Sequence, residues 1–153
     1  MGLVYDCPIE AISVSAVQDL WEWLTPSDAA GLLHSIVIEQ NTSETSEQLR
    51  LTVARVTGAP TSGSGGGTIT PAPRIPGAPA AGSTVERNNT TQITLGTSVK
   101  IADRGFNILN GIEIVFDPPV EVAPSTRIVV ALPTAPGAAL TVSGLLTVEE
   151  VGG

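Results

Sequence analysis

The chain has 153 residues, a length typical of one domain with one core, so we expect residues 1–153 to form a single domain. Its net charge is −8 and its seven basic residues are scattered along the sequence, which excludes the clustered basic footprint that nucleic-acid binding requires. The same charge disfavours an anionic membrane surface, no apolar stretch approaches the length of a membrane span, and the N-terminus shows no secretory signal.

The composition indicates an all-β protein. Aromatic residues make up 3% of the chain and charged residues 14%, and short runs of β-branched residues are separated by Gly, Pro, Asn and Ser. Cys7 is the single cysteine, so an internal disulfide and a Cys-rich metal site are excluded. We therefore expect no metal, no cofactor and a fold that is held by packing or assembly.

The first strand is predicted at residues 9–16, where Ile12, Val14 and Ala16 alternate with polar residues. The segment that follows has apolar residues at helical spacing, at positions 17, 20, 21 and 24, and Thr25–Pro26 would end a helix there. We expect one short helix. Trp21 and Trp23 cannot share a helix face, so one ring is expected to be buried and the other exposed. The pair either caps the core or forms a hot spot in a subunit or partner interface.

Alternation of apolar residues predicts the remaining strands. In 31–41 it puts Leu32, His34, Ile36 and Ile38 on one face, and a polar loop at 41–46 joins this strand to the next one at 47–58. Residues 83–105 are expected to form edge strands and turns. A strand within 106–122 ends at Pro118–Pro119, and a last pair follows at 125–133 and 138–151. Seven or eight short strands of this kind predict a single antiparallel β-sandwich that is jelly-roll-like.

Residues 58–82 form a Gly/Pro-rich stretch that contains seven glycines and five prolines. A hinge between domains is disfavoured here, because three strands and a short helix before it are too few for a core. A phosphate loop would need a lysine and a following helix, and both are missing. We expect an extended loop or arm inserted in one domain, flexible over 61–67, polyproline-like over 70–79, and ordered when it lies on a partner.

The residues with catalytic potential have simpler explanations. His34 is the single histidine and lies on an apolar strand face, which is typical of a core or interface histidine. Asp28, Asp103 and Arg104 lie in predicted turns, where turn chemistry explains them. We expect no catalytic residues. A hydrolase of cell-wall sugar or peptide stays as a minor hypothesis that substitution of His34 or Asp103 would test.

Several segments resemble small structural proteins of tailed bacteriophages and related prophages. They are SAVQDLWEWLTPSDAAGLLHSIVIEQNTSETSEQLRLTVARVTG, SGSGGGTITPAP, VERNNTT and STRIVVALPTAPGAALTVSGLLTVEEVGG. The resemblance covers most of the chain and its motifs are patterns of strand and loop. It implies a virion component, a capsid decoration (cement) protein on the outer surface of the phage head, made in the host cytoplasm. The family supplies no catalytic residues.

From this resemblance we expect binding to the major capsid protein and self-association as a homotrimer, with no nucleic acid and no membrane as partner. The alternative is a host-surface or carbohydrate-binding sandwich of a phage tail or head fibre. The residues expected to contact a partner are Trp21, Trp23, Thr70, Pro71, Pro73, Arg74, Ile75 and Pro76.

Overall fold

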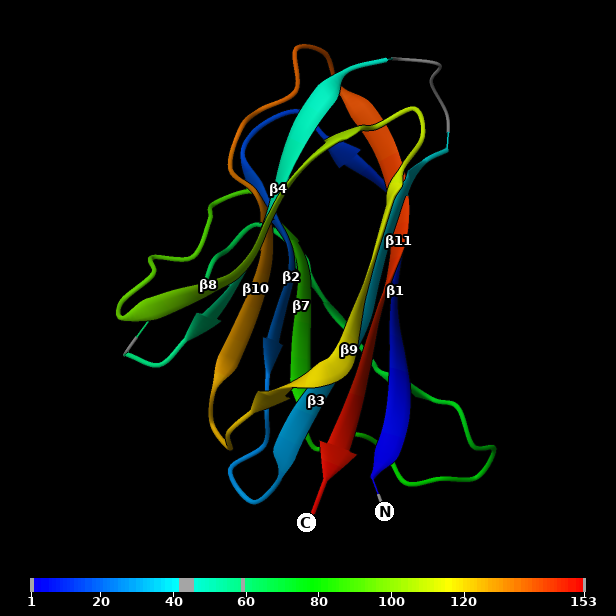
Figure 1. Cartoon of the computed structure of the whole chain (residues 1–153), viewed down its shortest axis with the longest axis vertical. Coiled ribbons are helices and arrows are strands. Elements are labelled where there is room, and N and C mark those ends of the chain that lie inside the picture. Colours follow the sequence, from blue (N-terminus) through cyan, green and yellow to red (C-terminus); the bar gives the residue numbers. More distant parts are fainter. Residues whose placement is uncertain (1, 42–45, 59, 153) are drawn as a thin grey trace.

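The computed structural model describes residues 2–41, 46–58 and 60–152, and it is a sandwich of two antiparallel sheets (Figure 1). Its strands are β1 (Leu3–Val14), β2 (Gln18–Leu24), β3 (Ala30–Gln40), β4 (Gln48–Val56), β5 (Gly67–Ile69), β6 (Ala72–Pro73), β7 (Thr84–Asn89), β8 (Ser98–Asn107), β9 (Ile112–Val122), β10 (Arg127–Leu132) and β11 (Leu140–Val151). The described part of the chain contains no helix, and hence no helix that is long and apolar enough to span a membrane. The predicted all-β sandwich is confirmed.

The strands alternate between the two sheets along the chain. One sheet has the order β6-β1-β11-β3-β9, and the other has the order β5-β7-β2-β10-β4-β8. Among β1–β4 and β8–β11, each connection crosses to the opposite sheet except the one from β4 to β8. That connection is the insertion of residues 57–97, which carries β5, β6 and β7 and places β5 and β6 at one edge of each sheet.

The predicted helix is wrong, because its residues form β2 in the centre of the six-stranded sheet. β2 pairs with β10 and β7, and a bulge between Trp21 and Asp19 leaves Leu20 without a partner in β10. Leu20 and Trp21 both join the core as a result, which produces the apparent helical spacing in a strand. Both faces of β2 are covered, so the apolar/polar alternation that identifies a half-buried strand is missing.

The core between the sheets is centred on the two tryptophans of β2, which share one strand face. Both side chains are fully buried, and the Trp21 indole nitrogen donates a hydrogen bond of 3.0 Å to the carbonyl oxygen of Cys7 in the opposite sheet. Their rings lie against glycines of that sheet. A Cβ at Gly31 would approach the Trp23 ring to 2.5 Å, and one at Gly144 would approach the Trp21 ring to 2.8 Å. Glycine is required at both positions by this close approach.

Other strands differ from the sequence expectations in register and length. β3 has a bulge at His34, so that Leu33 is in the core while Leu32 and His34 are half-buried. β9 does not end at Pro118–Pro119: it loses its pairing with β3 after Val115 and resumes it at residue 120. Residues 42–45 of the predicted polar loop lie outside the described residues.

The requirement for glycine at position 144 can be tested by comparison with a glycine that has space around it. We expect Gly144→Ala to lower the free energy of unfolding by about 1–3 kcal/mol, because the added methyl group overlaps the Val37 carbonyl oxygen and the Trp21 ring. Gly105→Ala is the control, since nothing lies closer than 4.0 Å to a Cβ there. Urea unfolding monitored by tryptophan fluorescence measures both, and equal effects of the two variants would contradict the packing argument.

Candidate functional site

The most distinctive surface of the molecule is the Gly/Pro-rich stretch of residues 58–82, here called the strap. It begins on the outer face of the six-stranded sheet, runs along the edge as β5, crosses to the edge of the five-stranded sheet as β6, and forms the green loop at the lower right of Figure 1. It is part of one sandwich and links the two sheets along one side.

Glu22 of β2 holds the glycine end of the strap. Its carboxylate is buried on the outer face of the sheet, where Oε1 accepts hydrogen bonds from Gly63 N (2.8 Å) and Asn89 Nδ2 (2.7 Å). Oε2 accepts from Ser62 Oγ (2.9 Å) and pairs with Arg127 of β10. The glycine end was expected to be flexible, but this carboxylate and its four donors fix it to the sheet.

A second buried carboxylate, Asp19, holds the loop that follows β7. It accepts hydrogen bonds from Ile93 N (2.6 Å) and Gln92 Nε2 (3.2 Å), and Ile93 packs in a small apolar cluster on the outer face of the sheet. Burial raises the pKa of Asp19 to about 6; the nearby Glu22 carboxylate adds to the rise, and the two donors limit it. This loop and the start of the strap are also joined by two isolated bridges, Thr61 to Thr94 and Ser64 to Thr91.

The proline end of the strap is bonded to the other sheet. Arg74 N donates to the Val4 carbonyl, and the Arg74 guanidinium forms a two-pronged pair with the Asp6 carboxylate at 2.8 Å for each bond. Burial alone would raise the pKa of Asp6, but the hydrogen bonds from Arg74 and Thr147 bring it below its usual value. The pair fixes the base of the protruding loop.

The other end of the protruding loop is held by Glu150 of β11. Its carboxylate accepts hydrogen bonds from Gly82 N (3.0 Å) and Ser83 N (2.7 Å). Tyr5, which is 1% exposed, donates its hydroxyl to the Pro79 carbonyl at 3.2 Å. The strap is therefore tied to its own chain at both ends, and the loop between Arg74 and Gly82 projects from the sandwich.

The tip is a tight turn that exposes one large apolar side chain. Ala78 N donates to the Ile75 carbonyl at 3.1 Å, with Pro76 and Gly77 between them, and Gly77 has a φ of 79°. Pro followed by a glycine at positive φ is typical of a type II turn. The turn leaves Ile75 55% exposed, so the tip presents a preformed apolar contact.

The structure separates the eight residues predicted to contact a partner into two groups. Thr70, Arg74, Ile75 and Pro76 are exposed on the strap, Pro73 is half-buried in β6, and Pro71 is buried. Trp21 and Trp23 lie in the core with no exposed surface, so the folded domain offers neither ring to a partner. The strap residues stay candidates for partner contact.

A cleft of about 480 Å³ lies beneath the end of the strap. Its walls include Leu3, Pro26 and Ala80, and its charged groups are Asp28 and Glu150. The Glu150 oxygens already accept the two backbone bonds of the strap. The sequence could not locate this cleft, because its walls come from both ends of the chain and from the strap.

The groups with catalytic potential are dispersed. His34 Nε2 lies 2.8 Å from Glu149 in the five-stranded sheet. The predicted turn at Asp103 and Arg104 is wrong, because both residues lie in β8 of the other sheet, where hydrogen bonds from Arg50 and Lys100 lower the pKa of Asp103. Burial raises the pKa of Cys7 to about 12, which keeps the thiol protonated. Within the described ranges, no group of three or more His, Cys, Asp and Glu side chains is arranged to hold a metal ion.

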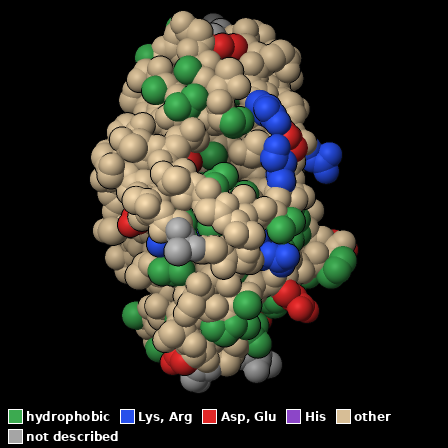
Figure 2. Space-filling model, turned by 90° about the vertical axis from the view of Figure 1, so that its left-hand side faces the viewer, with side chains coloured by type: hydrophobic (Ala, Val, Ile, Leu, Met, Phe, Trp, Pro, Cys, Tyr) green, Lys and Arg blue, Asp and Glu red, His purple; other side chains and the backbone are tan. Residues whose placement is uncertain are grey.

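Basic side chains are concentrated on one part of the surface. Four of the seven basic residues of the chain lie on β4 and β8, namely Arg50, Arg55, Lys100 and Arg104. In Figure 2 the Lys and Arg side chains gather along the right-hand border of the face in view. The sequence shows no clustering of these residues, because β4 and β8 are far apart in the chain and meet only through strand pairing.

Comparisons of the chain with protein-family models, with curated proteins and with solved structures each found no match. Its function is therefore argued from its own residues.

The buried Asp19 predicts a pH-dependent stability. Because its pKa is about 6 in the folded chain and lies near 3.8 in an unfolded one, the folded state binds the proton more tightly. The free energy of unfolding should fall as the pH rises from about 4 to about 6, by about 2–3 kcal/mol from this group. Asp19→Asn should remove the fall and be more stable than the wild type at pH 7.5. Urea unfolding at pH 4.5 and 7.5 measures this, with Asp28→Asn as the control for loss of one exposed carboxylate.

Removal of the Glu22 carboxylate should release the strap. Glu22→Ala leaves the half-buried Arg127 without its ion pair and Gly63 N without its acceptor, so we expect a loss of about 3–5 kcal/mol in the free energy of unfolding. Thermolysin should then cut the variant within the strap faster than the wild type under native conditions. Glu86→Ala is the milder comparison, since it removes one shared contact with Ser62 and one with Asn89. Equal cleavage rates in wild type and Glu22→Ala would contradict the role of this carboxylate.

Proposed function

We propose that the chain is a virion structural protein of a tailed phage, a capsid decoration protein that binds the outer surface of the major capsid protein and stabilises the head shell as a homotrimer. The sequence resemblance suggests this role, and the exposed turn at Ile75 is the structural observation that carries it. A contact surface that is formed before binding avoids the entropy cost of ordering a loop on the shell. The bonds of the strap to both sheets form such a surface, although the sequence had predicted an arm that orders only on a partner.

The strand order supports a virion role at the level of architecture. We infer a jelly roll: β1-β11-β3-β9 and β2-β10-β4-β8 follow the interleaved order of two four-stranded sheets, and the insertion lies between the fourth and fifth of these strands. Jelly rolls occur in viral capsid proteins and in lectins. The fold therefore agrees with the proposal and with its main alternative, and the choice between them depends on surface chemistry.

The surface chemistry favours protein binding over sugar binding. Carbohydrate sites use exposed aromatic rings for stacking. Of the five aromatic residues, Phe116 is half-buried and the other four are buried, namely Tyr5, Trp21, Trp23 and Phe106. The cleft beneath the strap has two carboxylates but no exposed ring. A host-surface or carbohydrate-binding module stays the second candidate because of this cleft, and a glycan array with the isolated domain tests it.

Two measurements test the proposed function. In purified virions, the number of copies of the chain per particle should equal the copy number of the major capsid protein or a fixed fraction of it. A handful of copies per particle would contradict the proposal. Shells made without the chain should bind the added protein, and Ile75→Glu should weaken this binding at least tenfold by placing a charge in an apolar contact. Leu109→Glu is the matched control, because Leu109 is 53% exposed and lies on the loop that joins β8 to β9.

A further inference from the structure

The side of the sandwich opposite β5 and β6 has two open sheet edges. β8 is the last strand of the six-stranded sheet and β9 is the last strand of the five-stranded sheet. The insertion adds β5 and β6 at the other edges, but nothing in the described chain pairs with the outer sides of β8 and β9. A free sheet edge is a surface that proteins either protect or use for binding.

The β8 edge is basic although the protein is acidic. With its neighbour β4 it carries Arg50, Arg55, Lys100 and Arg104 against the single carboxylate of Asp103, so its net formal charge is +3. The whole chain has a net charge of −8. Arg50 and Lys100 lie with Asp103 on the outer face of the sheet, whereas Arg55 and Arg104 lie on its inner side, where the edge is open. We call these residues, together with the half-exposed Val99, the basic surface, which spans both sides of the β8 edge.

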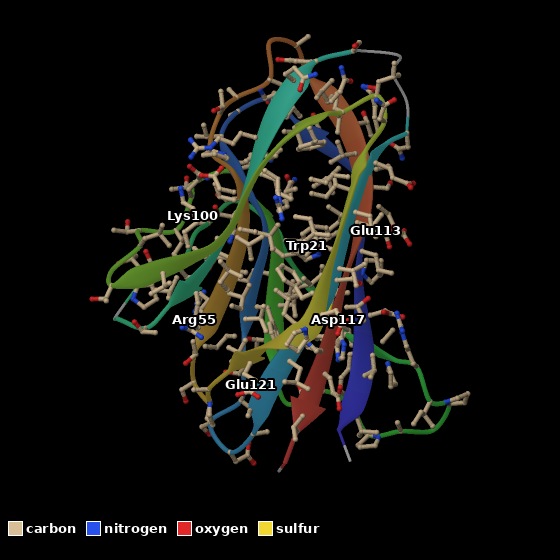
Figure 3. The ribbon with its side chains drawn as sticks, in the orientation of Figure 1. Trp21, Arg55, Lys100, Glu113, Asp117 and Glu121 are labelled. Atoms are coloured by element: carbon tan, nitrogen blue, oxygen red, sulfur yellow. The ribbon has the colours of Figure 1, made fainter. Side chains whose placement is uncertain are left out.

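The β9 edge carries the opposite charge. Glu113, Asp117 and Glu121 are exposed, the strand has no basic residue, and its net formal charge is −3. Val115, at 65% exposure, lies among them. We call these four residues the acidic surface. In Figure 3, Lys100 and Arg55 lie to the left on β8 and β4, while Glu113 and Asp117 lie along β9 to the right.

The two surfaces do not neutralise each other within one chain. Arg50 and Lys100 pair with Asp103 of their own surface, and Arg55 reaches only the backbone carbonyl of Glu121, at 3.4 Å. Between the described residues of the two surfaces no ion pair is formed, and Arg104 has no side-chain partner in the described chain. Four charged groups, Arg104 and the three carboxylates of β9, therefore stay available for an intermolecular contact.

We propose that the acidic surface of one copy docks on the basic surface of the next. The surfaces have equal and opposite charge, each has an exposed valine, and they lie on strands of 10 and 11 residues. Because they are different surfaces, the contact is head-to-tail, and it closes as a ring when the rotation between copies fits. Pro118 and Pro119 have no N–H, so β9 cannot form a continuous backbone ladder with β8, and side chains carry the contact. The inference deepens the proposed function, on which it rests for self-association.

Charge exchange tests the contact. The first variant combines Lys100→Glu with Arg104→Glu, and the second combines Glu113→Lys with Glu121→Lys. The third carries all four substitutions and keeps the net charge of the wild type. Sedimentation equilibrium at low salt should give a multiple of 15.6 kDa for the wild type, and three copies are expected. Each single-surface variant should lose at least about a hundredfold in association constant and sediment as one chain. The exchanged variant should recover the assembly.

The controls separate this contact from general effects of charge. Glu10→Lys, on an exposed site of β1, should leave the assembly unchanged, and salt at about 1 M should weaken the wild-type assembly. Urea midpoints check that each variant is folded. The proposal is overturned if the wild type is a single chain at high concentration in low salt, if a single-surface variant keeps the assembly, or if the folded exchanged variant stays monomeric.

Binding to shells distinguishes this inference from the proposed function. If the wild type is a monomer that still binds shells, the head-to-tail contact is refuted and the decoration function stands. If the wild type assembles but does not bind shells, the decoration function is refuted and the contact stands. A basic-surface variant that keeps its assembly but no longer binds shells would assign that surface to the capsid protein and overturn the inference.

Discussion

The sandwich depends on the packing of Trp21 and Trp23 of β2 against Gly144 and Gly31 of the opposite sheet. A chain with five aromatic residues places its two largest side chains on one strand face, and two glycines leave the space that both rings occupy. The Trp21 indole nitrogen also donates a hydrogen bond to the Cys7 carbonyl, which fixes the orientation of this ring between the two sheets. Figure 3 shows Trp21 between the two sheets. Because side chains of the two inner faces set how closely packed sheets approach, these contacts determine the separation of the two sheets.

The position of β2 also explains why the strap is held so firmly. A strand whose inner face is filled by tryptophans places Asp19 and Glu22 on the outer face, and both carboxylates are buried there. Buried carboxylates require hydrogen-bond donors, and the insertion supplies them through Gly63 N and Ile93 N. The glycine-rich sequence suits this task because backbone N–H groups can approach a carboxylate closely where no side chain intervenes. The strap therefore covers part of the outer face of the sheet, and its tip is a hydrogen-bonded turn on a loop that is bonded at both ends.

The sequence predicted the parts of the fold that depend on local alternation. In β11 the expected inward residues Leu140, Val142, Leu146 and Val148 are all buried, because this strand has one buried and one partly exposed face. β2 was mistaken for a helix because its bulge and its two covered faces remove that alternation. Residues 61–67 of the strap were expected to be flexible, and its order was expected to depend on a partner. The groups of the chain that hold it, Glu22 and Glu150, could not be identified because they lie 41 and 67 residues away from the groups that they bind. The basic surface was missed for the same reason, since its two strands pair only in the folded chain.

The sheet edges on one side of the sandwich are covered and those on the other side are open, and this difference bears on how copies of the chain would associate. On one side the strap adds β5 and β6 to the sheet edges and ties them to buried or paired carboxylates. On the other side β8 and β9 stay open, and their protection comes from charge and from the two prolines of β9. Charge of one sign on both edges would keep copies apart, but the signs are opposite. An arrangement of this kind disfavours identical edges meeting and favours unlike edges meeting, which gives self-association a direction. The strap tip, on the opposite side, is left free for a different partner.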